Sequence, residues 1–188
     1  MNRSPFRLLV LAVTAALAAL VVAAPAQAAA PYCGITWGSL AKQGPTGTAP
    51  AAGQTLSGVR AGRHECYDRV VLDVHGAAPR SWRVEYVGAV TEDPSGRPVS
   101  LGGGADLQIV VGASDRDASG QLTYHPSDPR HLVDVTGFNT VQQVASAGSF
   151  EGLTTVGLGV RARLPFRVFT LSSGGGGSRF VVDVAHRW

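Results

Sequence analysis

Short runs of alternating apolar and polar residues, separated by turn-forming residues, place the strongest limit on how this chain folds. The runs read YDRVVLDV, WRVEYVGAV, LQIVVGA, HLVDVTG, VQQVA, TTVGLGVRARL, FRVFTL and RFVVDVA. Stretches such as EDPSGRP, GGGAD and SSGGGGS lie between them and favour turns. No window keeps a helical stripe of apolar residues over three turns. The pattern predicts an all-β fold, a single β-sandwich or barrel-like domain of about seven or eight short strands.

One of these runs is written twice, as RVVLDV at 69–74 and as RFVVDV at 179–184. Within each copy the arginine and the aspartate share a strand face, because side chains alternate along a strand. Two arrangements are open: the copies occupy equivalent places in two half-sheets, or they are antiparallel neighbours with Val71 opposite Val181. In the second arrangement cross-strand ion pairs are expected. The expected pairs are Arg69 with Asp183 and Asp73 with Arg179.

Several runs also indicate which face is buried and where strands join. In WRVEYV the apolar side chains of Trp82, Val84 and Tyr86 fall on one side, as in a half-buried strand. FRVFTL and RFVVDV flank SSGGGGS and predict a hairpin with a glycine-rich tip. Pro165 precedes this hairpin and lacks an amide proton, so we expect it at a bend, a bulge or an edge.

The first 28 residues have the composition of a secretory signal peptide. Arg3 and Arg7 precede an apolar run at 8–24, and APAQA supplies a cleavage site that ends at Ala28. An uncleaved anchor is the alternative, since the run is nearly long enough to span a bilayer. The residues before Cys33 do not form a lipobox, and no later segment is apolar enough to cross a membrane. We expect a secreted or extracytoplasmic protein of the cell envelope.

The remaining length of about 160 residues fits one domain. Residues 29–56 are rich in Ala, Gly and Pro and are expected to form an arm and an exposed loop. Residues 57–188 are expected to form the β domain. The two cysteines, Cys33 and Cys66, both lie in the exported part, where an oxidising compartment favours a disulfide. We expect that they pair and tie the arm to the domain.

Charge and motif patterns argue against several classes of function. Removing Arg3 and Arg7 leaves 14 basic residues against 13 acidic ones, so the net charge falls from +3 to +1. There is no basic run with interleaved aromatics, which argues against nucleic acid. Ser149 in AGSFEG has no G-x-S-x-G elbow around it, which argues against a serine hydrolase. We expect no cofactor.

Two other patterns could suggest a metal. The chain has five histidines but no H-E-x-x-H, so a histidine metal site is not expected. The segment Asp115–Gly120, DRDASG, matches the opening of a calcium loop, yet Pro126 stands where the bidentate glutamate belongs. An acidic hairpin turn is the favoured interpretation of this segment, with calcium binding as the alternative.

Longer stretches resemble a known family. GFNTVQQVASAGSFEGLTTVGLGVRARLPFRVFTL, followed by RFVVDVAHRW, is similar to the AMIN-like domain of secreted and lipid-anchored actinobacterial proteins. YCGITWGS and VRAGRHECYDRVVLDV resemble the start of the same domain. The resemblance implies a sandwich-like fold in the cell envelope and binding to peptidoglycan or a periplasmic partner rather than catalysis. We expect no second domain after Trp188, so an enzyme that this module serves is expected to be another polypeptide.

The resemblance carries no ligand residues, so binding residues are predicted from chemistry. Aromatic faces stack on sugar rings, and guanidinium groups bind carboxylates. Strands emphasised by the resemblance supply five candidates: Tyr67, Arg69, Arg161, Arg163 and Arg167. The alternative is that Tyr67 is a core residue and that the arginines are solvated. Three hypotheses follow: a non-catalytic envelope module, a scaffold that binds a protein partner through a sheet edge, and a small secreted hydrolase.

Overall fold

The computed structural model describes residues 31–45 and 53–188 of the 188-residue chain. The predicted signal peptide, residues 1–28, lies outside the described residues. Within those two ranges, no helix has the length and hydropathy that a membrane span requires.

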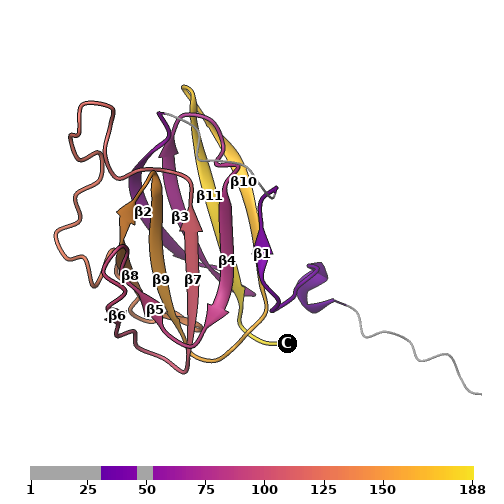
Figure 1. Cartoon of the computed structure of the whole chain (residues 1–188). Coiled ribbons are helices and arrows are strands. Elements are labelled where there is room, and N and C mark those ends of the chain that lie inside the picture. The colour runs from indigo at the N-terminus through magenta and orange to yellow at the C-terminus, as the bar shows by residue number, and fades with distance from the viewer. Residues whose placement is uncertain (1–30, 46–52) are drawn as a thin grey trace, which may run out of the picture.

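The described chain forms two antiparallel sheets that face each other as a sandwich (Figure 1). One sheet has four strands in the order β10 (Phe166–Gly174), β11 (Gly177–Ala185), β3 (Tyr67–His75) and β2 (Thr55–Arg63). The other has five strands in the order β1 (Lys42–Gln43), β4 (Trp82–Val87), β7 (Ala105–Val111), β9 (Leu153–Val160) and β8 (Val141–Phe150). A separate ribbon pairs β5 (Val90–Thr91) with β6 (Pro98–Val99). The predicted all-β sandwich is confirmed.

The core lies between the two sheets and is built from every second residue of their strands. The four-stranded sheet contributes Val70, Leu72, Val74, Phe180, Val182 and Val184. The five-stranded sheet contributes Val84, Leu107, Ile109, Val156 and Leu158. Trp82 and Tyr86 pack against this cluster, so the buried face predicted for WRVEYV is confirmed. Trp82 also makes an edge contact with Phe180, at 5.4 Å between ring centroids.

The two copies of the repeated motif are neighbouring strands. β3 and β11 pair antiparallel, with Val71 opposite Val181. In the same register Arg69 lies opposite Asp183, and Asp73 lies opposite Arg179. Of the two arrangements that the sequence left open, the structure therefore has the antiparallel neighbours and not the separate half-sheets. The hairpin predicted around the glycine-rich segment is also confirmed, because β10 and β11 pair along their length.

Two predicted strands are absent or shorter than expected. HLVDVTG, at 131–137, contains no strand, because Asp128 and Asp134 accept local backbone N–H groups and close turns there. Leu132 and Val133 nevertheless pack against the core. β9 ends at Val160, so residues 161–165 form a connection to β10 rather than the predicted strand VRARL. Pro165 lies in this connection, as expected of a residue without an amide proton.

One strand of the structure, β2, was not predicted from the sequence pattern. Its glycines, Gly58 and Gly62, weaken the apparent strand propensity. Both lie opposite charged residues of β3, since Gly58 pairs with Asp73 and Gly62 with Arg69. Thr55 and Leu56, assigned above to the exposed loop, are buried residues of β2. β2 therefore begins two residues before residue 57, the predicted start of the β domain.

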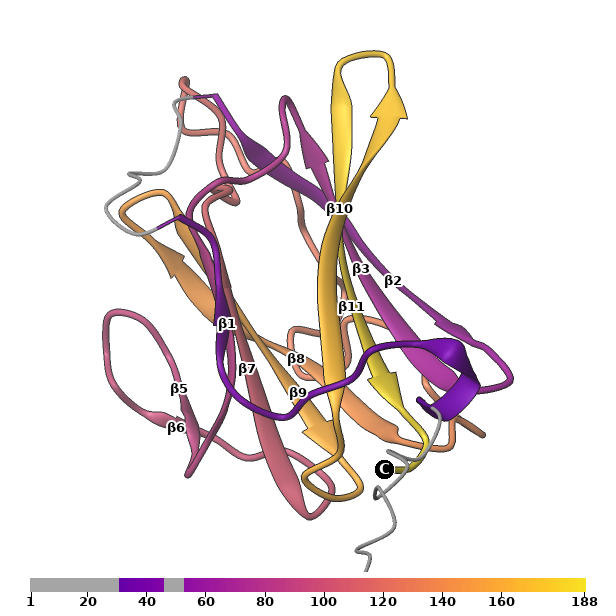
Figure 2. The same ribbon diagram turned by 90° about the vertical axis from the view of Figure 1, so that its right-hand side faces the viewer.

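Residues 31–45, here called the arm, are more ordered than the predicted loop. They begin with the short helix η1 (Tyr32–Gly34) and include β1. The N–H group of Phe166 in β10 donates to the Gly38 carbonyl at 2.9 Å, and Lys42 in β1 pairs with Val84 in β4. The arm thus runs from the edge of one sheet to the edge of the other along one side of the sandwich (Figure 2).

Candidate binding site

A buried carboxylate organises the outer face of the four-stranded sheet near the arm. Asp183 is fully buried and accepts hydrogen bonds from Arg69 on β3 and Arg167 on β10. Arg69 Nε lies 2.6 Å from Asp183 Oδ1, and Arg167 Nε lies 2.8 Å from Oδ2. Hydrogen bonding to Asp183 raises the pKa of Arg69. We call these three residues the charge cluster; it carries one net positive charge.

Aromatic rings surround the charge cluster. The Arg167 guanidinium carbon lies 5.5 Å from the ring centroid of Trp37, 5.2 Å from that of Tyr67 and 5.1 Å from that of Phe169. Arg69 lies at similar distances from Tyr67 and Phe169. Guanidinium groups above aromatic faces gain cation–π attraction, so the rings hold both arginines in place. Trp37 belongs to the arm, which therefore contributes directly to this face.

Three of the five predicted binding residues come together here: Tyr67, Arg69 and Arg167. The other two lie in the β9–β10 connection and make local contacts. Arg161 donates to the carbonyl groups of Asn139 and His186. Arg163 lies over the Tyr86 ring and donates to the Ser39 carbonyl at 3.3 Å. These contacts hold the connection and the arm; whether any of the five binds a ligand stays a prediction.

The second predicted ion pair, between Asp73 and Arg179, is not formed, so that prediction is wrong. Asp73 instead binds Arg60 of β2 through Nε at 2.6 Å and Nη2 at 2.7 Å. Arg179 donates to the Ser172 carbonyl at 3.1 Å. The register alone placed Asp73 opposite Arg179, but Asp73 also has a neighbour on β2. A guanidinium fork that reaches diagonally from that strand binds both carboxylate oxygens.

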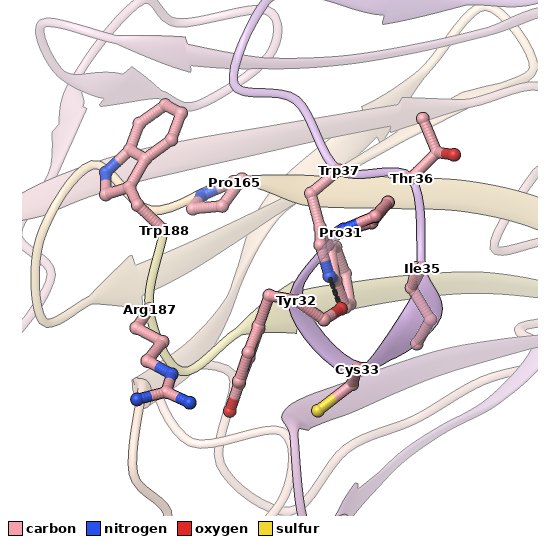
Figure 3. A pocket seen from close by; sticks show the side chains of 9 residues that line it. All are labelled: Pro31, Tyr32, Cys33, Ile35, Thr36, Trp37, Pro165, Arg187 and Trp188. Atoms are coloured by element: carbon pink, nitrogen blue, oxygen red, sulfur yellow. Dashed lines mark hydrogen bonds between the residues drawn. The ribbon is translucent and has the colours of Figure 1, made fainter. Parts of the chain in front are cut away.

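A groove lies beside the charge cluster, between the arm and the last two residues of the chain (Figure 3). Its volume is about 710 Å³. It is lined by Pro31, Tyr32, Cys33, Ile35, Thr36, Trp37, Pro165, Arg187 and Trp188. Arg187 and Trp188 face Tyr32 and Pro31 across it, with Pro165 between the two sides. Trp37 lines the groove and also contacts Arg167, so the groove and the charge cluster form one continuous surface.

The groove residues were missed by the sequence reasoning, which looked for binding residues on strands. A usable signal was present: Tyr32, Trp37 and Trp188 occur in segments with no strand or helix period, where an aromatic residue has no regular core face to enter. Trp188 is 70% exposed in the structure. The N–H group of Trp37 donates to the Tyr32 carbonyl at 2.9 Å, which orders the arm side of the groove.

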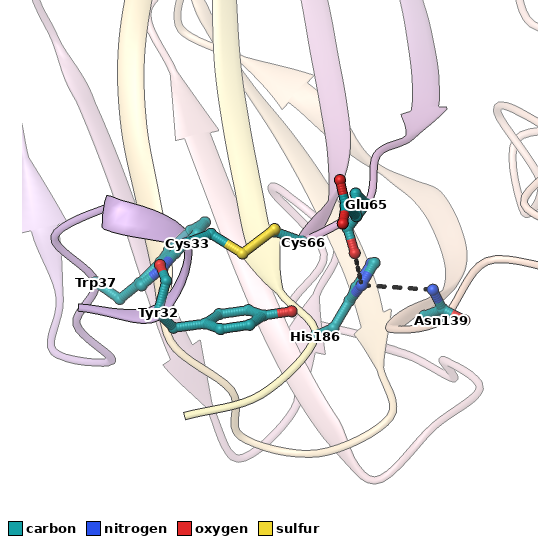
Figure 4. The surroundings of a disulfide bond; sticks show 7 residues. All are labelled: Tyr32, Cys33, Trp37, Glu65, Cys66, Asn139 and His186. Atoms are coloured by element: carbon teal, nitrogen blue, oxygen red, sulfur yellow. Dashed lines mark hydrogen bonds between the residues drawn. A yellow bond between two sulfur atoms is a disulfide. The ribbon is translucent and has the colours of Figure 1, made fainter. Parts of the chain in front are cut away.

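The predicted disulfide attaches the arm to the domain. Cys33 and Cys66 are bonded, with their Cα atoms 6.4 Å apart, and Cys66 lies in the turn between β2 and β3 (Figure 4). Cys33 itself has a φ of 54°, in the left-handed region, so η1 is a tight and irregular turn. The bond holds Tyr32 near the end of β11, where the opposite side of the groove begins.

We expect reduction of this disulfide to lower the free energy of unfolding by about 3–4 kcal/mol, because a bond across a long loop restricts the unfolded chain. The two cysteines are 33 residues apart. Urea unfolding with and without dithiothreitol measures the change. The double variant Cys33→Ala/Cys66→Ala serves as the control, since its unfolding midpoint must not respond to reductant. An unchanged midpoint in the natural protein would contradict the prediction.

A second buried carboxylate, Asp68, binds His186 near this end of the sandwich. Asp68 Oδ1 lies 3.1 Å from His186 Nε2, and Oδ2 accepts the N–H groups of Thr140 and Val141 at 2.6 and 3.0 Å. His186 Nδ1 lies 3.1 Å from the Glu65 carbonyl oxygen. Both ring nitrogens therefore have protein partners. The pair joins the ends of β3 and β11 to the start of β8, which is a structural arrangement.

The segment at 115–120, which was considered as a possible calcium loop, forms a turn. Asp117 Oδ1 accepts the N–H groups of Ser119 and Gln121 and the Ser119 hydroxyl. Arg116 bridges to Leu122 across the turn. The favoured interpretation as an acidic hairpin turn agrees with this geometry. Within residues 31–45 and 53–188, no group of three or more His, Cys, Asp or Glu side chains is arranged to hold a metal ion.

Comparisons with known proteins identify one similarity. A family model described as the AMIN-like domain matches residues 54–186. The match begins just before β2 and extends past the end of β11, so it covers most of both sheets. The arm lies outside it, as do Arg187 and Trp188. Searches of curated proteins and of solved structures found no match.

Proposed function

This chain belongs to the AMIN-like domain family, and from this premise we propose that it is a secreted, non-catalytic module of the cell envelope that binds peptidoglycan. The family associates the chain with envelope proteins. The composition of residues 1–28 supports export.

The observation that carries the proposal is the surface shared by the groove and the charge cluster. It presents the rings of Tyr32, Trp37, Tyr67 and Trp188 at one end of the sandwich. Sugar rings stack their C–H faces on aromatic side chains, which combine an apolar body with a polar edge. The two arginines of the charge cluster keep N–H groups at the surface that can bind anionic groups of a wall polymer.

Cosedimentation with purified sacculi tests this proposal. We expect the exported protein to sediment with sacculi and the variant Trp37→Ala to bind at least tenfold more weakly, because Trp37 contributes to both parts of the surface. Phe150→Ala is a matched control: Phe150 is a 47% exposed aromatic residue at the end of β8, in the other sheet. Thermal unfolding of each variant verifies the fold. Natural protein that stays entirely in solution would refute peptidoglycan binding.

A second candidate function, a scaffold for a protein partner, is favoured by the edge of β10. The arm pairs with this edge only at Phe166. From Val168 to Gly174 the outer edge of β10 has no strand partner among the described residues. An extended segment of another protein could add there as a further strand. Photocrosslinking from position 170 in cells distinguishes the two functions, because a scaffold must yield a protein adduct.

A further inference from the structure

We propose that the groove recognises a sugar-containing ligand with a free carboxylate, and that Arg187 binds this carboxylate. The inference rests on the proposed binding of peptidoglycan and names the chemical group of the ligand that the groove recognises. The carboxylate can belong to the sugar itself or to a short peptide attached to it. The arm and the chain end form the groove, and Pro165 is its one lining residue from within residues 54–186. The residues that would recognise the carboxylate therefore lie outside the part of the chain that matches the family model.

The lining of the groove suits a ligand that is partly apolar and negatively charged. Eight of its nine side chains are uncharged, and the ninth is that of Arg187. No acidic side chain lines it. A bound carboxylate would therefore meet a cation and no repelling side chain. The nearby Asp183 does not reverse this balance, because Arg69 and Arg167 both bind it. Glu65 lies beside His186, on the other side of the disulfide from Tyr32 and Trp37 (Figure 4).

Arg187 is held in position but keeps its hydrogen-bond donors free. Its guanidinium carbon lies 4.6 Å from the ring centroid of Tyr32. Stacking on a ring uses the face of the guanidinium and leaves the N–H groups at its edge. Among the described residues, no acceptor forms a hydrogen bond or an ion pair with these groups. Two parallel N–H groups at one edge match the two oxygens of a carboxylate, which is the geometry that arginine recognises best.

Size and exposure point to a small glycan fragment rather than a single ion. A volume of about 710 Å³ lies within the range typical of small-molecule sites. The Trp188 side chain, 70% exposed, lines the groove together with Arg187, and the two side chains extend in opposite directions from the chain end (Figure 3), so a ligand that contacts both must span the groove. A simple anion would contact Arg187 alone and would leave the aromatic lining residues without a partner.

The test compares sacculi whose carboxylates are intact with sacculi whose carboxylates have been amidated by carbodiimide and glycinamide. We expect the exported protein to bind intact sacculi at least tenfold more tightly. Arg187→Gln must reduce binding of intact sacculi to the level seen with amidated ones. Arg80→Gln is the matched control, because Arg80 is an exposed arginine in the β3–β4 connection, at the other end of β3 from Cys66. We expect no change in this variant.

The possible outcomes test the carboxylate inference separately from the proposed peptidoglycan binding on which it rests. Equal binding to intact and amidated sacculi overturns the carboxylate inference and leaves peptidoglycan binding standing. Absence of binding to both refutes peptidoglycan binding itself. Binding that disappears when phosphodiester polymers are stripped from the sacculi also overturns the inference, since the anion is then a phosphate. Competition by galacturonic acid oligomers assigns the carboxylate to a sugar, and competition by a muropeptide alone assigns it to the attached peptide.

Discussion

Phe180→Ala is expected to lower the free energy of unfolding by about 3–5 kcal/mol, the usual cost of truncating a buried aromatic residue. Phe180 lies in β11, at the centre of the four-stranded sheet, and its side chain is fully buried. Its ring contacts Trp82 of the facing sheet. Strands on both sides hold the backbone in place, so the surrounding core cannot collapse to fill the cavity.

Urea unfolding at equilibrium measures this effect, and Phe150→Ala again provides a matched control. Phe150 is about half exposed, at the end of β8, so its truncation removes little buried surface. We expect its cost to stay below about 1 kcal/mol. If the Phe180→Ala variant were as stable as the Phe150→Ala variant, Phe180 would not be buried between the two sheets as described.

Asp183→Asn is the second change expected to have a large effect, with a loss of about 2–4 kcal/mol in the free energy of unfolding. Removing one partner of a buried ion pair leaves its counter-charge uncompensated. Here the amide would face two guanidinium groups with at most one good acceptor. The side chains of Arg69 and Arg167 are 23% and 31% exposed, so water recovers part of the cost. The expected loss is therefore below the largest values known for such pairs.

Asp73→Asn is the control for this prediction, because the same chemical change occurs on the same sheet face. Asp73 binds Arg60, whose side chain is 58% exposed. Exposed ion pairs contribute little, so we expect a loss of about 1 kcal/mol or less. Chemical denaturation at neutral pH compares the two variants. Equal losses would mean that burial of Asp183 does not determine the strength of the charge cluster.

Much of the architecture followed from local patterns. Alternation along β4 assigned its buried face correctly, since one face of a half-buried strand must enter the core. The repeated arginine and aspartate suggested a register for antiparallel copies, which was one of the two arrangements that the sequence left open. β2 escaped detection, since its glycines have no side chains to create a pattern. HLVDVTG has the pattern of a strand, but its aspartates close local turns instead.

The candidate site was only partly predictable. Tyr67, Arg69 and Arg167 were chosen for their chemistry, and the sheet register brings them together. Asp183 was predicted to pair with Arg69, but the second arginine comes from β10, whose register against β11 was not predicted. The groove depends on contacts between the arm and the chain end, which are more than 140 residues apart in sequence.

The sequence by itself determined the all-β class and the disulfide partners, and it reduced the placement of the two motif copies to two arrangements. Each depends on a property that can be read from the residues themselves: alternation, the presence of only two cysteines, or charge pattern. Only the tertiary structure decided which arginine binds Asp73, where strands end, and that Tyr32, Trp37, Arg187 and Trp188 share one groove. These outcomes depend on which side chains from distant segments lie close enough to compete for the same partner. A local sequence pattern does not contain that information.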